Sequence, residues 1–421
     1  MNPPEPSARR DASPNNRPRV LLLTHRVPYP PDRGDRIRSW HVLSALAQHA
    51  DISLACLSDA PLHREAAERI RKLTTQSAIQ PITRFASAVR GGLAFAHGQA
   101  ITPAWFSRDA LRQKILAWHA EQPFDAIYVF CSGMISYLDG LLEGPKRPRV
   151  ILDLVDVDSA KWADLAERAP WPLRTILRTE AQRLRGIEHD QGSRADALLL
   201  VTEAERRLYL ERVGGGQPKV SPNGVDLQRF APLPDCPGKT LAFVGVMNYW
   251  PNVEAADWFA RKVLPRIRSR VPGANLKIIG RSPSRAVRNL RHLDGVTVTG
   301  PVEDVREHLR TATAVVAPLL TARGVQNKVL EAMACQRAVV CTPQAAQGID
   351  AIEGQEILIA RHADAWAEQI DLLLNDSPRR RTIAAAAYAR VQALGSWNKA
   401  LASLPNIVLG NEQHRPTRKA A

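Results

Sequence analysis

Short apolar runs alternate with helix-like stretches along almost all of this 421-residue chain, and this alternation constrains the fold more than any other feature. Continuous runs of Val, Ile and Leu predict strands that are covered on both faces, as in a parallel sheet. Helices between such strands make the doubly wound α/β pattern. The predicted strands are residues 19–25, 51–57, 124–130, 149–155, 195–201, 240–246, 274–280, 295–300, 313–319, 337–342 and 356–360.

The alternation pauses once, at KVSPNGVDLQRFAPLPDCPGK (residues 219–239), which is too rich in Pro, Gly and Asp for a long regular element. The chain is also too long for one ordinary core. We therefore expect two Rossmann-like domains that face each other across a cleft, with a linker between them and a final amphipathic helix. The N-terminal domain is expected at residues 18–220, the linker at 221–238, the C-terminal domain at 239–395 and the final helix at 396–408. Disordered tails are expected at residues 1–17 and 409–421.

Composition excludes several classes of protein. A hydrophobic content of 45% is typical of a globular chain, and no apolar run approaches the roughly 18 residues of a membrane span. The N-terminal stretch lacks the apolar core of a signal peptide. The five cysteines have no C-x-x-C spacing, which argues against a zinc site and for the reduced thiols of a cytoplasmic protein.

The net charge of +15 raises the question of an anionic partner. Nucleic acid is the first candidate, but the basic residues are spread along the chain, and an aromatic content of 5% leaves little to stack on bases. Anionic phospholipid or a phosphate-bearing substrate accounts for the charge equally well. We expect no nucleic-acid partner.

Functional residues in such a fold should follow the strands. Gly34 precedes a predicted helix after the first strand, where a glycine lets the backbone approach a ligand and helix N–H groups attract an anion. An ordinary capped loop explains Gly34 equally well. Gly280 and Arg281 follow a later strand, and arginine suits phosphate, although this chain has many surface arginines.

The stretch GVQNKVLEAMACQRAVV (residues 324–340) carries the strongest signal. Lys328 and Glu331 lie three residues apart on one side of an otherwise apolar helix that opens after a glycine. Helix amides and Lys328 suit phosphates, and the Glu331 carboxylate suits ribose hydroxyls. The alternative is a solvated Lys–Glu pair, but the apolar surroundings favour a nucleotide site.

The tripeptide Asp156-Val157-Asp158 has the spacing with which some glycosyltransferases hold a metal–nucleotide complex. It is short, and acidic residues that line a cleft or cap a helix explain it better. No Walker loop, G-x-G-x-x-G, H-E-x-x-H or G-x-S-x-G motif occurs, which weakens ATPase, dehydrogenase, zincin and hydrolase interpretations.

Four segments in order resemble the GT-B glycosyltransferases, specifically the retaining enzymes of family four (glycosyl transferases group 1). They are VSPNGVDLQRFAP, LAFVGVMNYWPNVEAADWF, LTARGVQNKVLEAMACQRAVV and SWNKAL, the last being similar to a helix that crosses back to the first domain. The resemblance covers residues 18–408. PYPPDRGDRIRSWH, NYWPN and GVQNKVLEAMA are similar to a subgroup associated with exosortase (PEP-CTERM) exopolysaccharide clusters.

This resemblance implies a nucleotide-diphosphate sugar held mainly by the C-terminal domain, with no cofactor and no metal. Glu331 matches a glutamate that holds the ribose, and Arg281 lies near the nucleotide and, with Lys328, is expected to stabilise the leaving diphosphate. Gly34 matches a loop of the first domain that approaches the phosphates and the acceptor. The other donor-binding residues implied are Gly245, Gly280, Gly324, Val325, Gln326 and Asn327.

Two departures from the family pattern stand out. Arg323 replaces the usual glutamate eight positions before Glu331, which leads to the hypothesis that it favours an acidic or differently arranged sugar. Many relatives carry a histidine at the end of a strand in the first domain, where this chain has Cys131 and Ser132. His25 and Asp156 are the candidate catalytic substitutes.

The resulting expectation is a retaining, metal-independent glycosyltransferase that acts on a saccharide or polyprenyl-linked saccharide in bacterial exopolysaccharide synthesis. A nucleotide-sugar epimerase on the same fold and a non-catalytic scaffold of a polysaccharide-assembly complex remain alternatives. WPLRTILRTEAQRLRGIE (residues 171–188) is basic and amphipathic, so we expect a cytoplasmic protein with peripheral attachment to the inner face of the membrane. Packing of this helix on its own domain explains its pattern at least as well.

Overall fold

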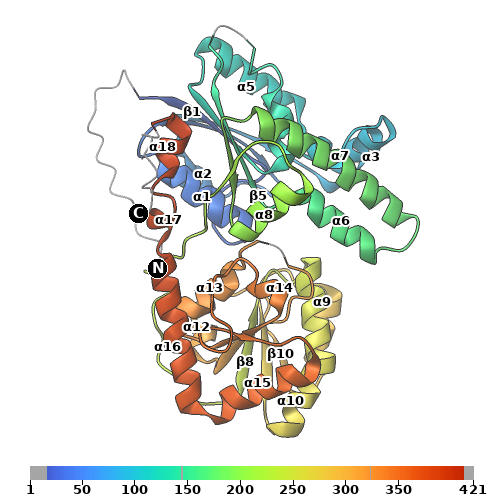
Figure 1. Cartoon of the computed structure of the whole chain (residues 1–421), viewed down its shortest axis with the longest axis vertical. Helices are drawn as coiled ribbons and strands as arrows, with labels where there is room; N and C mark the ends of the chain where they lie inside the picture. The colour runs from blue at the N-terminus through green and yellow to red at the C-terminus, as the bar shows by residue number, and fades with distance from the viewer. Residues whose placement is uncertain (1–16, 144–145, 323, 412–421) are drawn as a thin grey trace, which may run out of the picture. The chain divides into compact units, whose positions relative to one another are not determined.

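The computed structural model describes residues 17–143, 146–322 and 324–411. The chain forms two compact units (Figure 1): unit 1 comprises the residues up to Pro222 and those from Leu401 onward, and unit 2 comprises Asn223–Ala400. Each unit has a wholly parallel sheet, so the predicted α/β class with two doubly wound sheets is confirmed.

Unit 1 has a seven-stranded sheet in the order β3-β2-β1-β4-β5-β6-β7. Its strands are β1 (Arg19–Thr24), β2 (Asp51–Ser58), β3 (Gln76–Pro81), β4 (Ala126–Phe130), β5 (Arg149–Val155), β6 (Ala197–Leu200) and β7 (Pro218–Val220). Its helices are α1 (Gly34–Leu46), α2 (Arg64–Leu73), α3 (Arg84–Ala96), α4 (Ile101–Phe106), α5 (Asp109–Glu121), the 3-10 helix η1 (Ser132–Leu138), α6 (Asp158–Arg168), α7 (Leu173–Arg194), α8 (Glu203–Arg212) and α18 (Leu404–Leu409).

Unit 2 has a six-stranded sheet in the order β10-β9-β8-β11-β12-β13. Its strands are β8 (Thr240–Val244), β9 (Asn275–Ile279), β10 (Val296–Val298), β11 (Ala314–Ala317), β12 (Val339–Cys341) and β13 (Leu358–Ile359). Its helices are α9 (Trp250–Trp258), the π-helix η2 (Phe259–Val263), α10 (Leu264–Arg270), α11 (Arg285–Asn289), the 3-10 helix η3 (Leu290–His292), α12 (Val305–Arg310), α13 (Asn327–Ala334), α14 (Pro343–Ala346), α15 (Ala363–Asn375), α16 (Ser377–Leu394) and α17 (Trp397–Ala400).

In both units the order of the strands reverses beside the first strand. In unit 1 the chain runs outward from β1 through β2 to β3, then returns to add β4 on the other side of β1. In unit 2 it runs from β8 through β9 to β10 and returns to add β11 beside β8. Ligands of doubly wound folds bind at the carboxyl ends of the strands at such a reversal.

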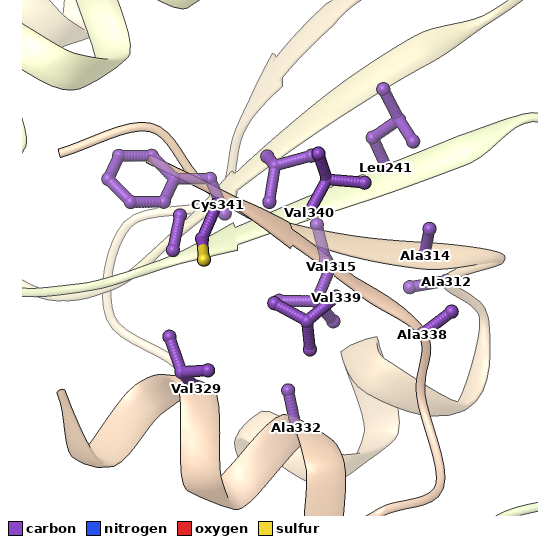
Figure 2. Close-up of a cluster of buried hydrophobic side chains, with 14 of the residues drawn as sticks. Leu241, Ala312, Ala314, Val315, Val329, Ala332, Ala338, Val339, Val340 and Cys341 are labelled. Carbon is purple, nitrogen blue, oxygen red and sulfur yellow. The ribbon is translucent and has the colours of Figure 1, made fainter. Parts of the chain in front are cut away.

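Apolar strands buried on both faces explain the cores. Figure 2 shows part of the core of unit 2, where Val329 and Ala332 of α13 point toward Val315 and Val339 of the sheet. Both of these α13 side chains are buried, so one face of the helix is anchored to β11 and β12. The anchored face leaves Lys328 and Glu331 on the remaining surface of the helix.

Two edge strands were not predicted from the sequence. β3 (QSAIQP) and β7 (PKV) are partly exposed and carry polar residues, so they lack the continuous apolar run that marks a strand covered on both faces. Among the described residues, no helix is both long and apolar enough to cross a membrane.

Candidate functional site

The ends of β8 and β9 approach each other closely at two glycines of unit 2. The Gly245 N–H donates to the Ile279 carbonyl at 3.0 Å, and the Met247 N–H donates to the Arg281 carbonyl at 2.9 Å. A Cβ atom on Gly280, whose φ is 149°, would lie 1.7 Å from the Gly245 carbonyl oxygen. Only glycine fits there, and the tight contact places the half-buried Arg281 at the carboxyl edge of the sheet.

Lys328, in the first turn of α13, reaches across the reversal of the strand order. Its ammonium donates to Asn252 Oδ1 at 2.7 Å and lies 5.3 Å from the centre of the Phe243 ring of β8. The Asn252 side-chain amide in turn donates to the Val246 carbonyl at 3.0 Å. This hydrogen bond orients the amide so that its Oδ1 faces Lys328. Burial lowers the pKa of Lys328 to about 8.

Glu331 lies half-buried one turn further along α13. Burial raises the pKa of its carboxyl group to about 7, against the opposing effect of Arg229 and Lys328. Among the described residues, no hydrogen bond to this carboxylate contributes to the shift. Partly buried carboxylates are usually hydrogen-bonded. Glu331 is an exception, and its oxygens can therefore accept hydrogen bonds from the hydroxyl groups of a bound polyol.

The residues that lead into α13 form an open helix start. Gly324 has a φ of 62°, in the left-handed region, and Gln326, two residues further on, is extended. Gln326 is the N-cap residue, and its side chain makes no capping hydrogen bond. Asn327 Oδ1 accepts from Asn223 Nδ2 at 3.1 Å, while the buried Asn327 Nδ2 has no partner among the described residues. Donors at a helix start suit an anion.

Unit 1 holds the other predicted residues. His25 follows β1, where Nε2 lies 3.1 Å from Asp35 Oδ2 and Nδ1 lies 3.3 Å from the Cys131 sulfur. Gly34 is the exposed first residue of α1. Asp156 follows β5 and forms an ion pair with Lys161 at 3.0 Å.

Lys161 also forms an ion pair with Asp158, again at 3.0 Å. One ammonium group is therefore paired with both carboxylates of the Asp156-Val157-Asp158 tripeptide. Among the described residues, no group of three or more His, Cys, Asp and Glu side chains is placed to hold a metal ion.

The predicted residues thus fall into two groups. Unit 2 brings together Gly245, Gly280, Arg281, the loop 324–327, Lys328 and Glu331 at one sheet edge, and unit 1 holds His25, Gly34 and Asp156. Arg323 lies outside the described residues. Sequence reasoning missed Asn252 and Phe243, although the NYWPN segment that holds Asn252 was quoted for its resemblance.

Part of unit 2 matches a known protein family. Residues 238–376, within unit 2, match the family described as glycosyl transferases group 1. The D-inositol 3-phosphate glycosyltransferase of Kineococcus radiotolerans is 28% identical over 330 residues, which cover 68% of this chain and 72% of that protein.

Solved structures are similar in fold. Sucrose-phosphate synthase of Thermosynechococcus elongatus has a TM-score of 0.68 at 17% identity, and the match covers 93% of this chain and 98% of that one. HepE of Anabaena in complex with UDP has a TM-score of 0.65 at 13% identity, with 92% and 98% covered. Residues 238–376 of unit 2 thus match glycosyl transferases group 1, and the fold of the chain matches that of solved GT-B glycosyltransferases, as the sequence predicted.

The contact between Gly245 and Gly280 leads to a stability prediction. The added Cβ of Gly280→Ala must displace the Gly245 carbonyl. We therefore expect the free energy of unfolding to fall by about 1–3 kcal/mol or more, measured as a fall in melting temperature. Gly300→Ala is the matched control, because Gly300 also has a positive φ (74°) but has nothing within 4 Å of an added Cβ. Equal losses in the two variants would show that the close approach is not what constrains Gly280.

Proposed function

We propose that the protein transfers a sugar from a nucleotide-diphosphate sugar to a saccharide acceptor, and that the donor binds at the carboxyl edge of the unit 2 sheet. The observation that carries this proposal is the pair formed by Lys328 and Glu331. Both side chains are half-buried at the reversal of the strand order, and burial shifts both pKa values toward neutrality. A ligand with an anionic end and a hydroxylated end stabilises both charges at once.

The chemistry of the surrounding groups fits the two ends of such a donor. The Glu331 carboxylate accepts hydrogen bonds from the ribose hydroxyls. Lys328, Arg281 and the N–H groups at the start of α13 bind the diphosphate. The UDP bound to HepE supports a nucleotide donor, and the relative from Kineococcus supports glycosyl transfer.

In the mechanism we propose, the diphosphate leaves as the acceptor hydroxyl attacks the anomeric carbon from the same face, with retention of configuration. Lys328, Arg281 and the helix amides stabilise the negative charge that develops on the leaving oxygen. The leaving phosphate takes the proton of the acceptor hydroxyl. Because protein groups supply the positive charge, the transfer needs no divalent cation.

The acceptor we propose is a lipid-linked saccharide in the synthesis of a bacterial exopolysaccharide, with the enzyme belonging to the exosortase-associated subgroup. The quoted segments PYPPDRGDRIRSWH and NYWPN support this placement. His25 and Asp156 in unit 1 are the proposed acceptor-side residues, since both follow strands of that sheet.

A panel of UDP, GDP, ADP and their sugars, read by thermal shift with EDTA present, tests the donor site. A nucleotide at 100 times its dissociation constant stabilises the folded protein by about 2.7 kcal/mol, which raises the melting temperature by a few degrees. We expect one base to give this rise, and Glu331→Gln to abolish it through loss of the charged acceptor. Transfer by this variant should fall roughly 100-fold.

Glu307→Gln, which changes an exposed glutamate of α12 in the same unit, should leave both the shift and the turnover unchanged. No shift with any nucleotide would favour the non-catalytic scaffold. Binding with interconversion of the free nucleotide sugar, and without transfer, would favour an epimerase. A shift that requires a divalent cation would contradict the metal-independent mechanism.

We also propose that unit 1 binds anionic membranes, and α3 supports this better than the helix chosen from the sequence. Phe85, Val89 and Leu93 recur every four residues on α3, with exposed fractions of 82%, 47% and 57%. In the stretch 171–188 the apolar side chains divide instead: those of Trp171, Leu173 and Ile176 are exposed, while Leu184 is buried in unit 1. The overall charge of +15 complements an anionic surface.

Flotation with vesicles that contain phosphatidylglycerol tests the membrane proposal. Wild type should float at low salt, and the double variant Phe85→Ser/Leu93→Ser should bind at least about tenfold more weakly because it loses the apolar face that inserts. Leu372→Ser removes an exposed leucine of α15 in unit 2 and should float like wild type. Wild-type protein that remains in the bottom fraction of the gradient at low salt, below the vesicles, would contradict membrane binding.

A further inference from the structure

Unit 1 brings a cysteine and a histidine together at the reversal of its strand order. Cys131 directly follows β4 and His25 directly follows β1, and these two strands are neighbours in the sheet. The Cys131 sulfur lies 3.3 Å from His25 Nδ1. The two residues are 106 positions apart in the sequence, so the fold alone creates the pair.

The imidazole is held in place on several sides. Its ring is stacked on Phe130 at a centroid distance of 5.8 Å and meets the edge of Phe106 at 5.4 Å. Its Nε2 lies 3.1 Å from Asp35 Oδ2. Asp35 is a carboxylate that also pairs with Arg26 at 2.6 Å and Arg33 at 2.9 Å, and these contacts hold its pKa far below its ordinary value despite burial.

These contacts decide where the proton of the imidazole lies. The ionised Asp35 can only accept, so Nε2 must donate, and Nδ1 is left as the acceptor that faces the sulfur. Transfer of the thiol proton to Nδ1 gives a thiolate beside an imidazolium. Burial alone lowers the pKa of His25, but Cys131 and Asp35 outweigh it and raise this pKa to about 9, which favours the charged ring.

The backbone of Cys131 is equally constrained. The residue has a φ of 68°, in the left-handed region, and its N–H donates to the Asp153 carbonyl of β5 at 2.8 Å. The residue is partly exposed, as a reaction with a small reagent requires. The geometry is that of an activated nucleophile: a thiol, a base within reach, and a carboxylate that orients the base.

Other cysteines in the described chain lack this environment. Cys56, Cys335 and Cys341 are buried, and burial raises the pKa of each thiol to about 12. They are therefore inert toward reagents that need a thiolate. Cys236 is partly exposed, and Cys236→Ser removes it from the comparison.

We propose that Cys131 is a reactive thiolate and a site of covalent modification by small electrophiles and by hydrogen peroxide. In the peroxide reaction the sulfur attacks one oxygen, the O–O bond breaks, and the departing hydroxide takes the proton of the His25 imidazolium. Cys131 is oxidised to the sulfenic acid, peroxide is reduced to water, and His25 becomes neutral. Oxidation thus removes the charge pair from the edge of unit 1 at which such sheets bind ligands.

The test is alkylation of the full-length Cys236→Ser protein with iodoacetamide between pH 5.5 and 9.5, followed at Cys131 by peptide mass spectrometry. The proposed transfer of the thiol proton to His25 should make the alkylation rate nearly independent of pH above pH 7. The rate at pH 6.5 should fall at least about tenfold in His25→Gln. His97→Gln, which changes an exposed histidine at the end of α3, should leave the rate unchanged.

A wild-type rate that climbs about tenfold per pH unit up to pH 8, as an ordinary thiol does, would overturn the proposal without any variant. An unchanged rate in folded His25→Gln would also overturn it. For the peroxide reaction, dimedone should label Cys131 after brief treatment with hydrogen peroxide, and Cys131→Ser should remove the label. Absence of the label in wild type would contradict the oxidation step. None of these readouts depends on glycosyltransferase activity.

Discussion

The hydrogen bond from Lys328 to Asn252 joins the two sides of the unit 2 sheet where the order of its strands reverses. Lys328 belongs to the helix after β11, and Asn252 to the helix after β8. The site depends on this contact because it draws the ammonium over Phe243 and into the protein. Burial lowers the pKa of Lys328, and under our proposal an incoming diphosphate raises it again.

Close packing beneath the site makes this arrangement rigid. The buried face of α13 packs on β11 and β12, so the helix cannot withdraw Lys328 and Glu331 from the sheet edge (Figure 2). On the other side, the contact of Gly280 with Gly245 brings the ends of β8 and β9 together. The groups that we propose to bind the two ends of a donor therefore have positions set by the core, as preorganised electrostatic stabilisation requires.

The sequence predicted the fold, and it marked the residues of the proposed donor site, because both depend on local patterns. Apolar runs marked the central strands. The edge strands β3 and β7 were not predicted, because they are partly exposed and lack a continuous apolar run. Lys328 and Glu331 were identified from their spacing on one helix. Asn252 was missed as their partner, and so was the contact of Cys131 with His25, because these pairs join residues 76 and 106 positions apart. Nothing local in the sequence encodes such contacts.

Proton uptake on donor binding tests most directly the claim that a diphosphate completes the charge of Lys328. At pH 8.5 a lysine with a pKa of about 8 is mostly neutral, and a bound diphosphate raises that pKa. Calorimetry of the preferred nucleoside diphosphate in buffers of different ionisation enthalpy should then show uptake approaching about 0.7 proton per site. Lys328→Arg should bind without this uptake, because its guanidinium is already charged. Binding to wild type without proton uptake, or uptake that persists in Lys328→Arg, would contradict the assignment of Lys328 to the diphosphate.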